Sequence, residues 1–347
     1  MAIPAQDVQN LFTKKLIDVY NERNTPTEFL RSFFDEEVSM TKEVSIAVKR
    51  GTESIAVDVQ RHSDGNMVTF NKSTEKIFIP PYYHQYMVAN EHRLYDTVIG
   101  SGSAPAFAQL TRELAEDMVD MRSTIERRIE LQCAQVLETG IVTLSNGDNI
   151  DYKRKAGSLV DLGAGNYWTT GTNDPREAFK AAGTFLRKEG KAAGGTFNAI
   201  VGSDVLNVML NNDTFQSVGD VRRIDLGAIA QPQRNAVGAS FHGQISAGSY
   251  NFNIWTYEQY YTDSNGNQQE YLSPKKVIVL PEMPRFKLAF GAVPQLIENG
   301  NVAQQGAYLI QEFMDKRRTA HEYHIKSAPL AVPVAVDQIY TFQPIAS

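Results

Sequence analysis

The sequence predicts an α+β protein that is organised around one very long helix. Three observations lead to this fold class: an unbroken helical pattern over residues 103–139, an alternating strand pattern over residues 44–80, and a return of short strands after residue 286. A chain of 347 residues can hold two domains, or one elongated domain with an insertion.

The long helix is predicted by the spacing of its apolar residues. These recur in steps of three or four, which average about 3.6 residues and keep one helical face aligned over the whole stretch. They are Phe107, Leu110, Leu114, Met118, Met121, Ile125, Ile129, Cys133 and Val136. Ser103 can cap the start, Pro105 suits the first turn, and Gly140 can take the left-handed closing position. At about 1.5 Å per residue the helix would be on the order of 50 Å long, so we expect it to be a scaffold element.

The opposite face of this helix carries a mixture of acidic and basic residues between Arg112 and Glu130. Glu126 and Glu130 lie beside Arg122 and Arg127, so their charges can compensate one another. We interpret this face as solvated or partner-facing. A coiled coil is disfavoured because the apolar steps follow a period of about 3.6 and not about 3.5 residues.

The composition excludes several classes of protein. The net charge of −6 and the lack of a lysine or arginine stripe disfavour sequence-specific DNA binding. There is no stretch of about 18 apolar residues and no basic leader at Met1, so we expect a cytosolic protein with neither a membrane span nor a secretory signal. The single cysteine, Cys133, excludes an intrachain disulfide and a cysteine-based zinc cluster, and its place on the apolar helix face predicts a buried thiol.

Residues 44–80 predict a long β-ribbon. Hydrophobic residues alternate with polar ones in four short runs, and Asp64-Gly65 is a hairpin turn signal between the second and the third run. The ribbon has few apolar residues beyond this alternation, and a two-stranded ribbon is hardly stable alone. We therefore expect it to lie against another surface.

Aromatic residues flank the ribbon on both sides. Before it, residues 6–20 predict a short amphipathic helix, which we expect to dock on a neighbouring subunit or another partner, and an aromatic knot follows that contains Phe33 and Phe34. After it, Pro80-Pro81 ends the ribbon. Residues 82–87 are interpreted as an aromatic corner that leads into the long helix.

Capping signals predict two shorter helices in the middle of the chain. Asp174 and Pro175 open the first of them, and Ser203 opens the second. Strands are predicted at 197–201, 244–246, 251–261, 275–280, 286–290, 307–313, 320–326 and 336–342. The residues around Pro329 and Pro333 are interpreted as turns.

No pattern in the sequence predicts an active site. His321 and His324 are one residue short of a metalloprotease spacing, and on a strand they would point to opposite faces. His84 and His92 are interpreted as too isolated to constitute a site, and residues 163–165 are only a fragment of a dinucleotide-binding loop. No catalytic, cofactor-binding or metal-binding residue is therefore predicted. A metal-dependent hydrolase that uses His321 and His324 is the weakest alternative.

Four segments carry a family resemblance when they are taken in order. They are the pairs Phe29-Leu30 and Phe33-Phe34, the ribbon end Phe78-Ile79-Pro80-Pro81-Tyr82, the turn 263–267 with the strand that follows it to Val279, and the tail from Ser327 to Pro333. Together with the long helix, these segments resemble the major capsid proteins of tailed bacteriophages, and more specifically the lambda-type major capsid family with its Hong Kong 97-like fold. The loops 163–171 and 213–240 match nothing in that family.

The resemblance implies a division of the chain and a function. It assigns residues 1–43 to an N-terminal arm, 44–85 to an extended β-ribbon (E-loop), 86–172 and 296–347 to a peripheral domain with spine helix 103–139, and 173–295 to an axial domain. It implies a major capsid protein that assembles into pentamers and hexamers of an icosahedral head around double-stranded DNA, with each ribbon over a neighbouring subunit. An encapsulin-type shell that holds cargo shares the fold and stays open as an alternative.

The implied partners are other copies of the chain, a scaffolding protein, a portal, often a small decoration protein, and the packaged DNA through non-specific contacts. The implied location is the virion, after assembly in the cytoplasm of a host bacterium. Residues of the arm and the ribbon are expected at assembly contacts. They are Phe33, Phe34, Asp64, Gly65, Pro80, Pro81 and Tyr82.

Overall fold

The structure is a computed structural model with a mixed arrangement of helices and sheets, which confirms the predicted fold class. It describes residues 26–48, 74–89, 105–144, 147–170, 172–216, 233–234, 238–263, 265–297, 300–304, 306–315 and 320–346. The predicted helix at 6–20 and the ribbon tip with Asp64 and Gly65 lie outside the described residues.

The chain forms two compact units, and each is assembled from segments that are far apart in the sequence. The first unit contains Met1–Thr27, Tyr83–Arg128 and Tyr308–Ser327, and the second contains Glu28–Tyr82, Ile129–Ala307 and Ala328–Ser347.

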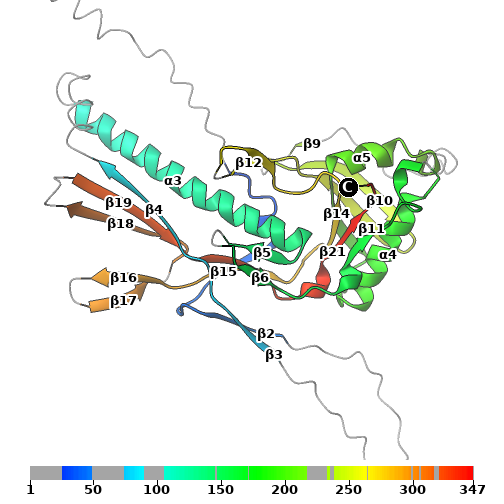
Figure 1. Ribbon diagram of the computed structural model, residues 1–347, viewed down its shortest axis with the longest axis horizontal. Helices are drawn as coiled ribbons and strands as arrows, with labels where there is room; N and C mark the ends of the chain where they lie inside the picture. Colours follow the sequence, from blue (N-terminus) through cyan, green and yellow to red (C-terminus); the bar gives the residue numbers. More distant parts are fainter. Residues whose placement is uncertain are drawn as a thin grey trace, which may run out of the picture. The chain divides into compact units, whose positions relative to one another are not determined.

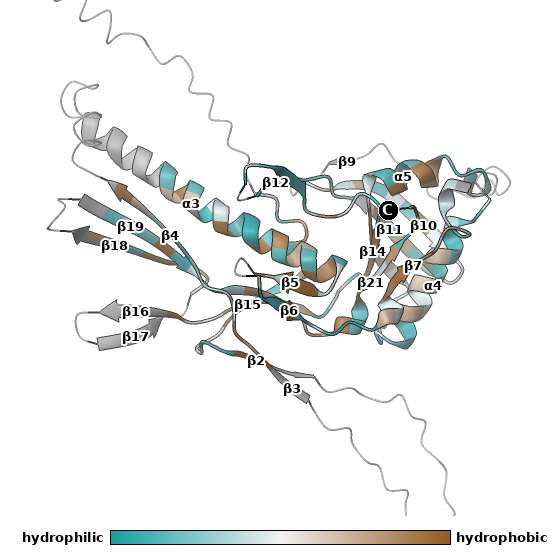
Figure 2. Ribbon diagram, in the orientation of Figure 1, coloured by the Kyte–Doolittle hydropathy of each residue, from teal (hydrophilic) through white to brown (hydrophobic). Residues whose placement is uncertain are grey.

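The predicted long helix is confirmed as α3, Pro105–Glu138 (Figure 1). Figure 2 shows hydrophobic and hydrophilic residues alternating along its C-terminal half, and the apolar positions there are buried, with Cys133 at 0% exposure. Gly140 closes the helix with a φ of +78°, and its N–H donates to the carbonyl of Val136 at 3.0 Å. The length and the end of α3 therefore follow from local signals in the sequence.

The second unit is built on a seven-stranded mixed sheet. In spatial order its strands are β7 (Leu159–Asp161), β21 (Tyr340–Gln343), β14 (Val277–Pro281), β8 (Thr196–Val201), β11 (Tyr250–Thr256), β10 (Ser240–Ala247) and β9 (Gln233–Arg234). β8 pairs in parallel with β11 and antiparallel with β14. β14 is buried along its whole length, and for this reason its sequence is a continuous apolar run without alternation (Figure 2).

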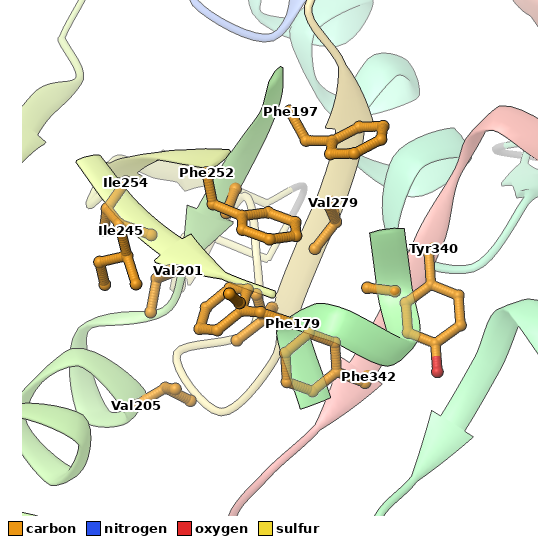
Figure 3. Packing of buried hydrophobic residues seen from close by; sticks show 14 of the residues in the cluster. Phe179, Phe197, Val201, Val205, Ile245, Phe252, Ile254, Val279, Tyr340 and Phe342 are labelled. Carbon is orange, nitrogen blue, oxygen red and sulfur yellow. The ribbon is translucent and has the colours of Figure 1, made fainter. Parts of the chain in front are cut away.

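Helices α4 (Pro175–Lys188) and α5 (Ser203–Leu210) share one hydrophobic core with this sheet. Phe179 of α4 lies at the centre of the core, with its ring 5.2 Å from that of Phe252 on β11 and 5.7 Å from that of Phe342 on β21 (Figure 3). Large buried aromatic rings of this kind each bury a large apolar area in a core. Phe179 thus packs α4 against two strands, β11 and β21, that are not neighbours in the sheet.

The start of α4 is confirmed as the capping signals predict. The side chain of Asp174 accepts a hydrogen bond from the backbone N–H of Arg176 at 3.0 Å, and Pro175 occupies the first helical position.

Short 3₁₀ helices occur at four other places along the described chain. They are η1 (Arg31–Phe33), η2 (Ala156–Ser158), η3 (Trp168–Thr170) and η4 (Val336–Gln338).

Smaller sheets complete the second unit. One has the order β1 (Asp35–Val38), β15 (Phe286–Phe290) and β20 (Pro329–Pro333), and the two-stranded ones are β2 (Val44–Val48) with β3 (Thr74–Phe78), β5 (Ile141–Thr143) with β6 (Asn149–Asp151), β12 (Tyr260–Thr262) with β13 (Gln268–Glu270), and β16 (Val293–Ile297) with β17 (Gly300–Gln304). β1 pairs in parallel with β15, so part of the predicted arm belongs to a sheet of its own chain.

The first unit contains a three-stranded antiparallel sheet beside its part of α3 (Figure 1). β19 (Ala320–Ser327) is the central strand, with β18 (Leu309–Asp315) on one side and β4 (Tyr83–Ala89) on the other. β4 and β19 are separated by more than two hundred residues in the sequence.

Three of the interpretations that concern strands and turns are wrong. Residues 83–89 form β4 and not a corner, because pairing with β19 extends the backbone over the whole stretch. The prolines at 329 and 333 lie at the ends of β20, which is an edge strand of the described sheet and tolerates their missing N–H groups. Residues 336–338 turn as η4, so the last strand begins only at Tyr340.

Candidate assembly surfaces

A buried carboxylate holds the chain at residues 30–31, inside the predicted arm. Glu130 on α3 accepts hydrogen bonds from the backbone N–H groups of Leu30 at 2.8 Å and Arg31 at 3.1 Å. The hydroxyl of Tyr257 donates to the same carboxylate at 2.8 Å. We call Glu130 and these three donors the arm anchor. The helical pattern assigns Glu130 to a solvated face, which is wrong: three donors from other segments cover it, and it is 1% exposed.

The carboxyl group of Glu130 has a pKa close to neutral pH. Burial raises the pKa of Glu130 to about 7, although the hydrogen bonds from Leu30, Tyr257 and Arg31 favour the charged form. The side chain can therefore exchange a proton near physiological pH, and its ionised form accepts all three hydrogen bonds.

The aromatic knot of the predicted arm packs against its own chain. The ring of Phe29 lies 5.5 Å from that of Trp255 and 5.4 Å, edge-on, from that of Phe33. Phe34 is 4% exposed and contacts Phe286 with the ring centroids 5.2 Å apart. Phe33 is only half-buried. The assembly role expected for Phe33 and Phe34 remains a prediction.

The base of the ribbon is formed by β2 and β3, which pair antiparallel with Val44 opposite Phe78. The ring of Phe78 lies 5.1 Å from that of Tyr152 and attaches the ribbon to its own unit. Ile77 and Ile79 precede and follow Phe78, so they point to the other side of the strand, and they are 61% and 55% exposed. The ribbon base therefore presents an isoleucine pair that faces away from Phe78.

The residues that end the ribbon differ in exposure. Pro80 is buried and lies close to Gly291, where a Cβ would come within 3.1 Å of the proline ring. Pro81 is half-buried, and Tyr82 is 50% exposed with its pKa raised by partial burial. The exposed apolar surface is thus interrupted at Pro80 and resumes at Tyr82.

One face of the sheet in the first unit gathers aromatic and ionisable side chains. It carries His84, Tyr86 and Val88 of β4, Glu322, His324 and Lys326 of β19, and Gln311 and Phe313 of β18, which the strand pairing places on the same side. We call it the histidine face. Nε2 of His84 lies 2.8 Å from Nδ1 of His324.

The interpretation of His84 as isolated is wrong. His84 and His324 are 240 positions apart in the sequence, and only the pairing of β4 with β19 brings them together. The sequence signal for this contact is the alternation of side chains in β4 and in β19. It predicts that the two histidines share a face only once the pairing of these strands is known. Of the other histidines, His242 lies on β10, 2.7 Å from the hydroxyl of Thr256, and burial lowers its pKa. The side chains of His92 and His321 lie outside those described.

Within the described ranges, no three histidine, cysteine, aspartate or glutamate side chains converge as a ready-made metal site. No helix in those ranges is both long and apolar enough to span a membrane.

Comparison with solved structures defines the fold. A prophage protein from Escherichia coli CFT073 that was assigned as a capsid protein aligns with a TM-score of 0.64 and 16% identity, covering 99% of this chain and 100% of its own. The capsid protein of cyanophage P-SCSP1u aligns with a TM-score of 0.53 and 9% identity, covering 98% and 95%. The SrpI encapsulin of Synechococcus elongatus PCC 7942 aligns with a TM-score of 0.50 and 12% identity, covering 99% and 96%. These similarities confirm the Hong Kong 97-like fold.

Comparison at the level of sequence gives the family. No curated protein sequence matches the chain significantly. The family model described as phage major capsid protein E matches residues 12–343, which is nearly the whole chain and agrees with the lambda-type resemblance. The chain therefore belongs to the phage major capsid protein E family and is a capsid shell protein.

Proposed function

We propose that this capsid protein assembles into pentamers and hexamers of an icosahedral head that encloses double-stranded DNA. The observation that carries the proposal is the ribbon base: among the described residues β2 and β3 pair only with each other, and Ile77 and Ile79 are more than half exposed. Burying one such side chain stabilises a contact by roughly 1.5–3 kcal/mol. A neighbouring subunit supplies the surface that buries them.

The proposal also assigns a structural role to each segment of the chain. Residues 1–43 act as the arm, 44–85 as the E-loop, 86–172 with 296–347 as the peripheral domain, and 173–295 as the axial domain around which the capsomers close. The α4 and α5 core supports a rigid axial domain. Its sheet is completed by β7 and β21, so the axial domain takes two strands from outside 173–295.

The arm and the ribbon act from fixed bases. The arm anchor holds Leu30 and Arg31 on α3, so that the residues before them reach a neighbouring subunit from a defined point. Phe33 and Phe34 belong to this base, Asp64 and Gly65 form the ribbon tip, and Pro80, Pro81 and Tyr82 set the direction in which the ribbon leaves the subunit.

The partners in this proposal are other copies of the chain, a scaffolding protein, a portal and a decoration protein. Contact with the packaged DNA is non-specific and weak, because a chain with a net charge of −6 and no lysine or arginine stripe in its sequence releases few counterions from the DNA. Assembly takes place in the cytoplasm of the host bacterium.

The test is a double variant of the ribbon base, Ile77→Asp with Ile79→Asp, in the full chain. Two exposed carboxylates leave the folded subunit intact but cannot be buried on a neighbour without a large desolvation cost. We expect an unchanged far-UV circular dichroism spectrum and no shells by electron microscopy or sedimentation. The matched control is Met283→Asp, because Met283 is 87% exposed in the turn between β14 and β15. Shells in the double variant at normal yield, or equal failure of the control, would contradict the proposal.

A cargo-holding shell of the encapsulin type is the second candidate, favoured by the similarity of fold to the SrpI encapsulin. The two candidates differ in what the particle contains. Particles purified from cells in which the phage grows are expected to contain DNA, read from their absorbance ratio at 260 and 280 nm and from electron micrographs. Particles filled with one protein species and free of DNA would favour the encapsulin type.

A further inference from the structure

The two histidines of the histidine face are placed as a chelating pair. The strand register sets His324 opposite Tyr86 and His84 opposite Lys326, so the histidines are diagonal neighbours on adjacent strands. Their rings are inclined by only 25°, and Nε2 of His84 faces Nδ1 of His324 at 2.8 Å. His84 is exposed, and the side chain of His324 is 12% exposed, so a small solute can approach from the side of His84.

A carboxylate fixes the protonation of the inner ring. Oε2 of Glu322 lies 3.3 Å from Nε2 of His324. An ionised carboxylate only accepts hydrogen bonds, so Nε2 of His324 carries the proton and Nδ1 presents a lone pair toward His84. Metal-bound histidines commonly donate their second N–H to a carboxylate in this way, which orients the ring and raises its basicity.

Aromatic rings hold His324 in position. Tyr86 stacks on it with the centroids 5.6 Å apart, and Phe313 meets it edge-on at 5.1 Å. The imidazole is thus fixed by neighbours on both adjacent strands and by Glu322. Such preorganisation lowers the entropy cost of binding a ligand.

We propose that His84 and His324 form a two-histidine site for a divalent transition metal ion such as Zn²⁺, with Glu322 as its orienting residue. The site does not depend on shell assembly, because all three residues belong to one unit of one chain. Water completes the coordination. Imidazole nitrogen is a preferred ligand of Zn²⁺, Ni²⁺ and Cu²⁺.

Binding needs one tautomer change and a small movement. In the free protein His84 donates its Nε2–H to Nδ1 of His324; on binding, the proton of His84 moves to its Nδ1, and both facing nitrogens then donate lone pairs to the metal without net proton release from the neutral pair. Zn–N bonds of about 2.0–2.1 Å in tetrahedral geometry separate the two nitrogens by roughly 3.3 Å, so the rings open by about 0.5 Å. The exposed His84 ring can make this movement.

Two charged side chains lie beside the histidine pair. Partial burial lowers the pKa of His84, and His324 and Lys326 lower it further. The ammonium of Lys326 opposes a bound cation, but it donates to Gln311 at 2.8 Å and lies over the ring of Phe313. The carboxylate of Glu322 offsets this charge from the other side of His324.

The experiment is a calorimetric titration of the full chain, without a histidine tag, with Zn²⁺ at pH 7.5. We expect one Zn²⁺ per chain with micromolar affinity, and a cobalt derivative with the visible absorption of nitrogen-ligated Co²⁺. His84→Gln and His324→Gln should each weaken binding at least tenfold, and Glu322→Gln by about tenfold. His242→Gln, a matched change in the second unit, should leave binding within twofold of the wild type. At pH 5 the wild type should bind at least tenfold more weakly, because the imidazoles become protonated.

A loss of Zn²⁺ binding in the variants can be distinguished from a folding defect. His84 is exposed, so the His84→Gln variant should keep the circular dichroism spectrum and the metal-free melting temperature of the wild type. Zn²⁺ should raise the melting temperature of the wild type and not of His84→Gln. Equal binding by wild type and His84→Gln, or no binding by the wild type below about 100 μM Zn²⁺, would overturn the site.

Discussion

Glu130 on α3 accepts a hydrogen bond from the backbone N–H of Leu30 across 2.8 Å, although the two residues are one hundred positions apart in the sequence. This contact joins α3 to the beginning of the described chain. Because Glu130 is almost fully buried, the strength of the contact depends on its protonation and on all three of its donors. A single side chain thereby holds residues 30 and 31 against α3.

Removal of the acceptor should destabilise the second unit strongly. Glu130→Ala leaves two backbone N–H groups and the Tyr257 hydroxyl without their acceptor in a buried site, so we expect a loss of about 3 kcal/mol or more in the free energy of unfolding. Urea denaturation of the unassembled chain, followed by tryptophan fluorescence, measures the loss, because Trp255 contacts Phe29 beside the anchor. The control is Glu37→Ala, which removes an exposed ion pair with Lys287 and should cost less than about 1 kcal/mol. Equal losses in the two variants would show that the anchor is not special.

The pH dependence of stability should carry the signature of Glu130. Its pKa is about 7 in the folded chain against 4.5 as the ordinary value, so the folded state binds the proton more tightly than the unfolded state. The resulting stabilisation is complete below about pH 4.5 and is lost as the pH rises through 7, by about 3 kcal/mol at about 1.36 kcal/mol per pH unit.

Glu130→Gln tests this titration directly. The neutral amide keeps an oxygen for Leu30 and Tyr257 but cannot titrate, so the difference in unfolding free energy between wild type and variant should change between pH 5 and pH 8. A difference that is constant over this range would place the titration elsewhere.

Arg154 should be as important as Glu130, and it acts at the C-terminal end of α3. Its half-buried guanidinium donates to the carbonyls of Leu137 at 3.1 Å and Glu138 at 3.2 Å, which lie in the last turn of the helix, and to the hydroxyl of Thr341 at 3.1 Å. Burial lowers the pKa of Arg154 to about 10, so it stays charged at neutral pH. We expect Arg154→Met to destabilise the chain by about 3 kcal/mol in urea denaturation, because several part-buried acceptors lose a charged donor.

The neighbouring residue provides the control for Arg154. Lys153→Met changes a side chain that is 77% exposed and should cost less than about 1 kcal/mol. Arg154→Lys should fall between these two, because one ammonium group cannot reach all the acceptors of the planar guanidinium. A variant Arg154→Met as stable as Lys153→Met would contradict the assigned role.

Gly202 should tolerate no side chain. A Cβ at this position, in the turn between β8 and α5, would lie 2.1 Å from the carbonyl oxygen of Pro274, and backbone atoms cannot move aside easily. We expect Gly202→Ala to destabilise the chain by about 2 kcal/mol or more, as overpacking does. Gly165→Ala is the matched control, because nothing lies within 4 Å of its Cβ. Thermal melting of both variants distinguishes the two positions, and a neutral Gly202→Ala would show that the turn can relax.

Much of this fold is predicted by local patterns. The period of α3, its closing Gly140, the capped start of α4 and the two strands at the ribbon base all depend on residues within a few positions of one another, and the structure confirms them. The order of these elements also sufficed for the resemblance that the family match confirms. The prolines at 329 and 333 led to a prediction of turns where β20 lies. That prediction is wrong because a strand's position at the edge of a sheet is not a local property of the sequence.

The sequence by itself determined the long helix, the ribbon strands and the family, because periodicity and capping act within one or two turns of chain. Only the tertiary structure decided that Glu130 is buried under Leu30 and that His84 meets His324. The physical reason is that burial and side-chain pairing depend on which distant segments close upon one another. That closure is set by the summed packing of whole elements, which no single stretch of residues contains.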